Sequence, residues 1–153
     1  MKRNENIQPL SRDHHFGLLF CWKIRKGLAN AIEIERINGY VNYFWLSNLH
    51  QHFLEEETIL FHQLNDKLCN DGIREHRAIA LLIDKINGTE KQNPRAYEEL
   101  ATLITQHIRF EERVLFPHLE KTLSADQLDN IGLALAGLHQ KEVVDEYADE
   151  FWS

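Results

Sequence analysis

The sequence predicts an all-α fold: an antiparallel up-down four-helix bundle with an additional C-terminal helical segment. Apolar residues recur at helical spacing along almost the whole chain, and alternating strand patterns are absent. Only three prolines and seven glycines interrupt the 153 residues. We expect a single domain over residues 1–153, with the bundle at about residues 8–121 and the C-terminal helical segment at about 124–151.

Turn-forming residues divide the bundle. Asn-Gly pairs at residues 38–39 and 87–88 are typical helix ends. The stretch from Gly88 to Pro94 is the clearest loop, and Pro94 suits the first position of a helix. Ser124 and Gln127 form a capping box that opens the last segment. The expected helices are about residues 12–37, 40–68, 73–86, 94–121 and 124–151.

Composition limits the partners and the location. The formal net charge is -7 with a pI of about 5.7, which argues against nucleic acid or an anionic membrane as the main partner. The first ten residues contain no apolar signal region, and apolar runs such as residues 18–22 are too short to span a bilayer. We therefore expect a cytoplasmic protein. Cys21 and Cys69 lie far apart in the sequence and fit buried apolar positions better than a disulfide or a zinc motif.

A repeated sequence motif contains the candidate metal ligands. Residues 52–64 read HFLEEETILFHQL and residues 107–119 read HIRFEERVLFPHL, with six identities in thirteen aligned positions. Each copy contains a His-x-x-x-Glu motif: His52 with Glu56, and His107 with Glu111. Residues four apart share one helix face, roughly 6 Å apart along the axis, so both side chains can reach one metal ion.

Helix faces distinguish the glutamates of the repeat. Glu56 and Glu111 fall on apolar stripes, where an unpaired carboxylate would cost several kcal/mol, and a metal ion would remove that cost. A lone His-x-x-x-Glu is usually an exposed pair, but two copies in register favour a metal site. Glu57 and Glu112 lie about 140° round the helix from their histidines, so we expect them to be solvated and Glu112→Ala to change little.

Further ligands should come from the other two helices of the bundle. The third expected helix offers His76 on an apolar face. The first offers two neighbours: matching Arg12-Asp13-His14 to Arg74-Glu75-His76 favours His14, whereas the apolar face favours His15. We prefer His15, with His14 as the alternate. The remaining histidines are expected at the surface or in hydrogen bonds, and His139 is the first of them to check: His50, His62, His118 and His139.

This set of motifs resembles the hemerythrin-like, or HHE cation-binding, domain family over roughly residues 8–120. The resemblance rests on the first-helix histidine, on Glu75-His76, and on both His-x-x-x-Glu motifs with their Glu-Glu-x-x-Leu-Phe continuation. It implies a non-haem centre of two iron ions, with His15 and His52 on one ion and His76 and His107 on the other. Glu56 and Glu111 would bridge the ions, and zinc or manganese could occupy the same ligands.

The sequence departs from the oxygen carriers of that family. Their fifth histidine, one turn before the third-helix ligand, is here replaced by Gly72. The expected ligand set is therefore His15, His52, Glu56, His76, His107 and Glu111, with a coordination position left open. We expect binding or sensing of a small ligand such as dioxygen, nitric oxide or peroxide. The alternatives are iron handling or iron–sulfur repair, a di-iron oxidoreductase, and a metal-free structural bundle. The C-terminal segment could cap the bundle or support a homo-oligomer.

Overall fold

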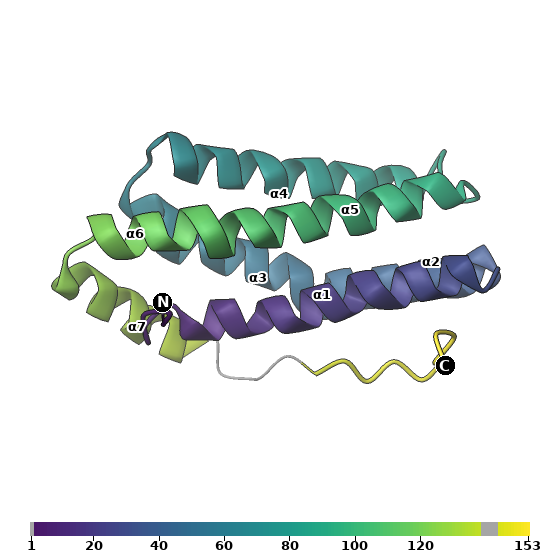
Figure 1. Ribbon diagram of the computed structural model, residues 1–153, viewed down its shortest axis with the longest axis horizontal. Coiled ribbons are helices and arrows are strands. Elements are labelled where there is room, and N and C mark those ends of the chain that lie inside the picture. The colour runs from purple at the N-terminus through teal and green to yellow at the C-terminus, as the bar shows by residue number, and fades with distance from the viewer. Residues whose placement is uncertain (1, 139–143) are drawn as a thin grey trace.

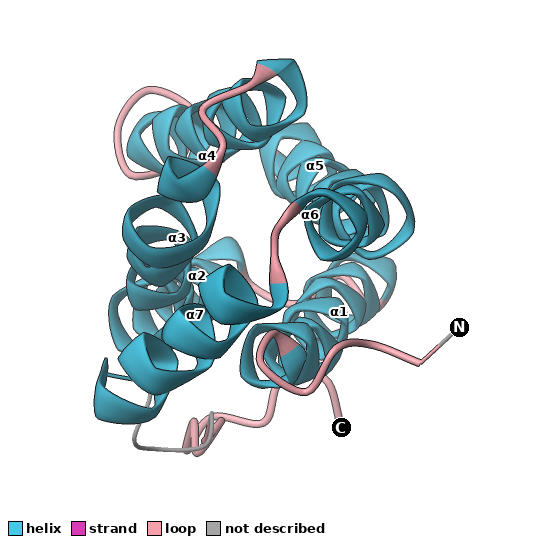
Figure 2. Ribbon diagram, turned by 90° about the vertical axis from the view of Figure 1, so that its left-hand side faces the viewer, coloured by secondary structure: helices cyan, strands magenta, loops and turns pink. Residues whose placement is uncertain are grey.

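A computed structural model of the protein describes residues 2–138 and 144–153. Four long antiparallel helical segments form a bundle, and a shorter helix crosses one of its ends (Figures 1 and 2). No strand occurs among the described residues, so the all-α fold class is confirmed. The helices are α1 (Gln8–Ala29), α2 (Ile34–Phe44), α3 (His50–Glu55), α4 (Lys67–Ile86), α5 (Pro94–Phe110), α6 (Phe116–Thr122) and α7 (Ala125–Leu138).

The second and fourth long segments contain wide helical turns. The π-helical turns η1 (Trp45–Leu49) and η2 (Glu56–Leu60) join α2, α3 and the 3-10 turn η3 (Phe61–Gln63) into one continuous helix. The π-helical turn η4 (Glu111–Leu115) joins α5 to α6 in the same way. Each π-helical turn inserts one residue relative to an α-helix, and such insertions are frequent at functional sites.

The first helix ends earlier than the sequence predicts. It stops at Ala29, and the chain reverses through Asn30 and Ala31, whose φ is +53°. Asn38 and Gly39, expected to form the stop, lie inside α2. Packing explains why these two residues occur inside a helix. Asn38 is buried and hydrogen-bonds to Tyr97, and a Cβ at Gly39 would lie 2.6 Å from the hydroxyl of Tyr147.

The apolar core has two parts separated by a polar layer. One part is built around Phe20, Tyr40 and Leu100, and the other around Leu60 and Phe116. On α1 and α4, the buried His14 and His76 lie between residues of the two parts. The buried His52 and His107 lie next to Phe53 and Ile108, where the first part ends along their segments. The bundle therefore encloses a layer of titratable side chains with apolar packing on both sides.

The C-terminal segment is helical only in its first part. The expectation of a helix reaching Phe151 is wrong for residues 144–153, which form an irregular chain lying along α1 and α2 (Figure 1). Phe151 is buried against Gly27, where a Cβ would lie 2.7 Å from its ring. His139 lies outside the described residues. None of the described helices has a stretch long and apolar enough to cross a bilayer.

Candidate metal centre

Two clusters of buried histidines and glutamates lie in the polar layer. Each contains two histidines and the same two glutamates, with one ligand-type atom per residue and all such atoms within 4.8 Å of one another. The clusters are His14, His52, Glu56 and Glu111, and His76, His107, Glu56 and Glu111. Two carboxylates shared between the clusters form a donor arrangement that could bridge two metal ions.

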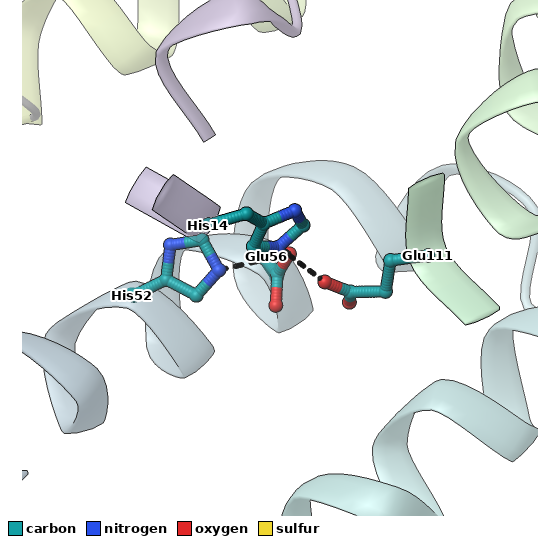
Figure 3. A group of neighbouring side chains, drawn as sticks. All are labelled: His14, His52, Glu56 and Glu111. Atoms are coloured by element: carbon teal, nitrogen blue, oxygen red, sulfur yellow. Dashed lines mark hydrogen bonds and ion pairs between the residues drawn. The ribbon is translucent and has the colours of Figure 1, made fainter. Parts of the chain in front are cut away.

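The first cluster joins α1, α3, η2 and η4 (Figure 3). His14 Nε2 lies 2.8 Å from Glu111 Oε1 and 3.8 Å from Glu56 Oε2. His52 Nε2 lies 3.1 Å from Glu56 Oε2. In Figure 3 both imidazoles and both carboxylates point toward a common centre.

The second cluster mirrors the first. His76 Nε2, from α4, lies 3.0 Å from Glu56 Oε1 and 3.7 Å from Glu111 Oε2. His107 Nε2, from α5, lies 3.3 Å from Glu111 Oε2 and 3.1 Å from His76 Nε2. Glu56 and Glu111 thus each direct one oxygen to the first histidine pair and the other oxygen to the second pair.

The preference for His15 is corrected by this placement. His14 is buried in the cluster, whereas His15 is exposed and its ring contacts that of Phe16. The apolar face that favoured His15 is not buried, because Leu18 is 43% and Trp22 51% exposed. The other predicted residues, His52, Glu56, His76, His107 and Glu111, all lie in the clusters.

Each cluster histidine also contacts an outer carboxylate through its other ring nitrogen. The Nδ1 of His14 lies 2.7 Å from Glu112, and the Nδ1 of His76 lies 2.8 Å from Glu57. The Nδ1–carboxylate pairs of the other two histidines are His52 with Asp13 at 2.9 Å and His107 with Glu75 at 2.7 Å. A proton held on Nδ1 by a carboxylate leaves the Nε2 lone pair facing inward, the form that binds a metal.

The outer carboxylates follow the internal repeat. Glu57 and Glu112 directly follow the shared glutamates and reach the histidines of α4 and α1. Asp13 and Glu75 directly precede those histidines on α1 and α4 and reach the histidines of the repeat. The expectation that Glu57 and Glu112 are simply solvated is therefore wrong, because a residue about 100° from a buried one faces the neighbouring helix of the bundle.

Electrostatics keep the shared carboxylates ionised. For Glu111, burial raises the pKa, but the charge of His107 and close contacts with His107, His14 and His76 outweigh it and hold the pKa well below its usual value. For His14, burial lowers the pKa, and its contacts with Glu111, Glu112 and Glu56 raise it overall. Similar contacts raise the pKa of His52 to about 9 against the opposing effect of burial. The ionised carboxylate is the ligand form of this side chain.

The atoms at the centre fit a bound cation. His52 Nε2, Glu56 Oε2 and Glu111 Oε2 are buried and have no hydrogen-bond partner. Buried polar atoms normally find a partner, and a metal ion would satisfy all three. The donor set of imidazole nitrogens and carboxylate oxygens suits iron, manganese and zinc.

The two sides of the centre differ in packing. On the α4 side, a Cβ at Gly72 would lie 3.0 Å from Leu115 and 3.1 Å from Phe61, so this position has no room for a further ligand. On the α1 side, a cavity of about 20 Å³ touches His14, His52 and His107. Its other lining residues are mostly apolar and include Gly17, Phe44, Leu49, Phe53, Ile104 and Ile108.

Among the described residues, the histidines outside the clusters have ordinary surroundings. His50 and His62 are exposed, and His118 pairs with Asp66 at 2.6 Å near the surface. Both cysteines are buried, as expected, and unpaired. Burial raises the pKa of the Cys21 thiol to about 11, which disfavours the reactive thiolate.

Comparison with known protein families identifies the family of this chain. No curated protein and no solved structure matches the chain. A family model described as the hemerythrin HHE cation binding domain matches residues 7–119, which include all the cluster residues and outer carboxylates. The chain therefore belongs to the hemerythrin HHE cation-binding domain family.

Proposed function

We propose that the two clusters hold two iron ions, and that the centre binds a small ligand such as dioxygen, nitric oxide or peroxide. The shared carboxylates Glu56 and Glu111 support a two-metal centre, because each offers one oxygen to each histidine pair. Iron would supply a coordination position for the ligand and the capacity to exchange electrons with it. Binding or sensing, rather than turnover, is the role that we propose.

The cavity beside His14 and His52 carries this proposal. Its volume of about 20 Å³ has room for about one water-sized molecule, and its walls are mainly apolar. A small neutral molecule can enter such a space at little cost, whereas an organic substrate would not fit without displacing core side chains. The cavity therefore supports a diatomic ligand better than oxidation of a larger substrate.

Metal content and ligand response test the proposal together. We expect about two irons per chain after anaerobic loading, and a change in visible absorption when the reduced protein meets oxygen or nitric oxide. Absence of iron after loading, with zinc or manganese bound instead, would overturn the choice of metal. Iron that binds without any spectral response would remove the ligand-binding role.

Iron handling is the alternative that the same protein sample can test. The ligand carboxylates are 0% exposed, which favours slow release of metal. Rapid transfer of the iron to an apo iron–sulfur protein or to a chelator would point to iron handling instead. Retention of the iron over the same period would be the expected result.

A further inference from the structure

Asn48 places a buried amide nitrogen beside the cavity. It lies in the π-helical turn η1, four residues before His52, and it lines the cavity with Leu49 and Phe53. The side chain as a whole is half-buried, yet its Nδ2 is buried and has no hydrogen-bond partner. Asn48 therefore extends from near the surface to the cavity wall.

A donor in this state destabilises the fold. A buried polar group without a partner costs desolvation energy that no bond offsets, and folded proteins contain few such groups. Each of the other polar side chains at the cavity has at least one partner, and the one other orphan atom there, His52 Nε2, is a ligand atom of the proposed metal site. His14 contacts Glu111 and Glu112, and His107 contacts Glu75. His52 contacts Asp13, whose carboxylate also lines the cavity. The Asn48 amide is thus a donor that a molecule in the cavity could use.

We propose that Asn48 Nδ2 donates a hydrogen bond to the ligand in this cavity and so favours small ligands that carry an anionic acceptor atom. This inference rests on the proposed function and adds selectivity to it. The physical reason is that a hydrogen bond to a charged acceptor is stronger than one to a neutral acceptor. In a pocket whose walls are mainly apolar, one free donor can then distinguish ligands of similar size.

Cyanide and nitric oxide are suitable probes, because both are diatomic and only cyanide is an anion. Cyanide would be titrated into the oxidised, iron-loaded protein and nitric oxide into the reduced protein. Asn48→Leu keeps the approximate side-chain volume and removes the donor. We expect it to weaken cyanide binding roughly tenfold or more, with a smaller effect on nitric oxide.

Asn48→Asp is the second variant, since it keeps the side-chain shape and replaces the donor by a carboxylate. It should weaken cyanide binding further by repulsion. Ser47→Ala, at an exposed position of the same turn, should change neither ligand. The melting temperature of the metal-free Asn48→Leu protein should equal or exceed that of the wild type, because a donor without a partner has been removed.

The outcomes separate this inference from the proposed function. If the wild type binds neither probe, the proposed function fails. If it binds cyanide and both Asn48 variants bind it equally well at unchanged iron content, the role of Asn48 is overturned while the proposed function stands. A lower melting temperature of metal-free Asn48→Leu would also contradict the inference, since it would show that the amide already has a stabilising partner.

Discussion

His14 and Glu112 form a contact between neighbouring helical segments, with His14 Nδ1 2.7 Å from the carboxylate of Glu112. The same carboxylate accepts a hydrogen bond from Ser11 at 2.8 Å and lies 3.5 Å from the guanidinium of Arg3. Burial raises the pKa of Glu112, but the contacts with His14, Ser11 and Arg3 together outweigh this and lower it, so the carboxylate stays ionised. Glu112 therefore fixes the orientation of a histidine that faces the centre.

Glu112→Gln should weaken metal binding. Loss of an outer carboxylate typically costs about 10–100-fold in metal affinity, and we expect a change in that range by competition with a chelator. This replaces the sequence-based expectation that Glu112 matters little. Arg113→Gln, at the exposed next position, is the control. Equal affinities of the two variants would show that the carboxylate does not position His14.

The shared glutamates and the individual histidines should give different metal counts. Glu111→Ala removes a carboxylate common to both clusters, so both ions should be lost. His107→Ala removes a ligand of one cluster only, so about half of the metal should remain. His14→Ala should behave like His107→Ala, whereas His15→Ala should leave the content unchanged. Elemental analysis checks all four, and full occupancy in Glu111→Ala would refute a shared carboxylate.

Most residues of the two buried clusters can be predicted from the sequence, because a helix fixes the direction of its own side chains. The repeat gave His52, Glu56, His107 and Glu111, whose buried neighbours lie at helical spacing on the same segment. For the first helix, the match between Asp13-His14 and Glu75-His76 predicts His14, which lies in the cluster. The apolar face predicts His15 instead, and this is wrong because α1 also carries exposed apolar residues.

The outer carboxylates were not predictable from helix faces alone. Glu57 contacts His76 on α4, and Glu112 contacts His14 on α1. Their partners lie on other segments, so the contact depends on how the helices pack and not on spacing within one helix. The same holds for Gly39, whose role depends on Tyr147, more than a hundred residues away in the sequence.

Ile108→Ala should speed ligand entry. Ile108 lines the cavity and is 4% exposed, so removal of its outer carbons enlarges the space beside His14. Ile83→Ala is a matched control, since Ile83 is 2% exposed and does not line the cavity. Each substitution should destabilise the protein by about 2–5 kcal/mol. Stopped-flow association of nitric oxide should be faster in Ile108→Ala only, and equal rates would exclude this cavity as the entry route.

Asp66 should make part of the stability depend on acid pH. Its carboxylate accepts from the backbone N–H of Cys69 at the start of α4 and contacts His118. Burial raises the pKa of Asp66, but His118 and the backbone of Cys69 lower it overall. The stabilisation is therefore present above the unfolded-state pKa of about 4 and is lost as the pH falls through the lower folded value.

The corresponding variant is Asp66→Ala. At pH 7 it should lower the free energy of unfolding by about 1 kcal/mol, the usual cost of losing such a cap, and the difference from wild type should shrink below about pH 4. Urea titrations at several pH values measure both. Asp71→Ala is the control, since that carboxylate pairs with the exposed Lys67 within α4. A difference that persists unchanged to pH 2 would contradict a role for the ionised carboxylate.

Asp145 should anchor the C-terminal chain. Its carboxylate lies 2.7 Å from Lys23 Nζ, with side chains that are 4% and 8% exposed, and it accepts from the hydroxyl of Tyr40. Lys23 also lies 4.1 Å from the ring centre of Trp152. Asp145→Ala leaves a buried ammonium without its carboxylate, so we expect a loss of about 3–5 kcal/mol in the free energy of unfolding.

A double variant and a control at an exposed ion pair test whether the buried Lys23–Asp145 pair is responsible for this loss. Adding Lys23→Met to Asp145→Ala should recover much of the loss, because the uncompensated charge is removed. Asp149→Ala breaks the pair with Arg36, whose side chains are 39% and 38% exposed, and should cost under about 1 kcal/mol. If Asp145→Ala cost no more than Asp149→Ala, the buried pair would not hold residues 144–153 on α1 and α2 in solution.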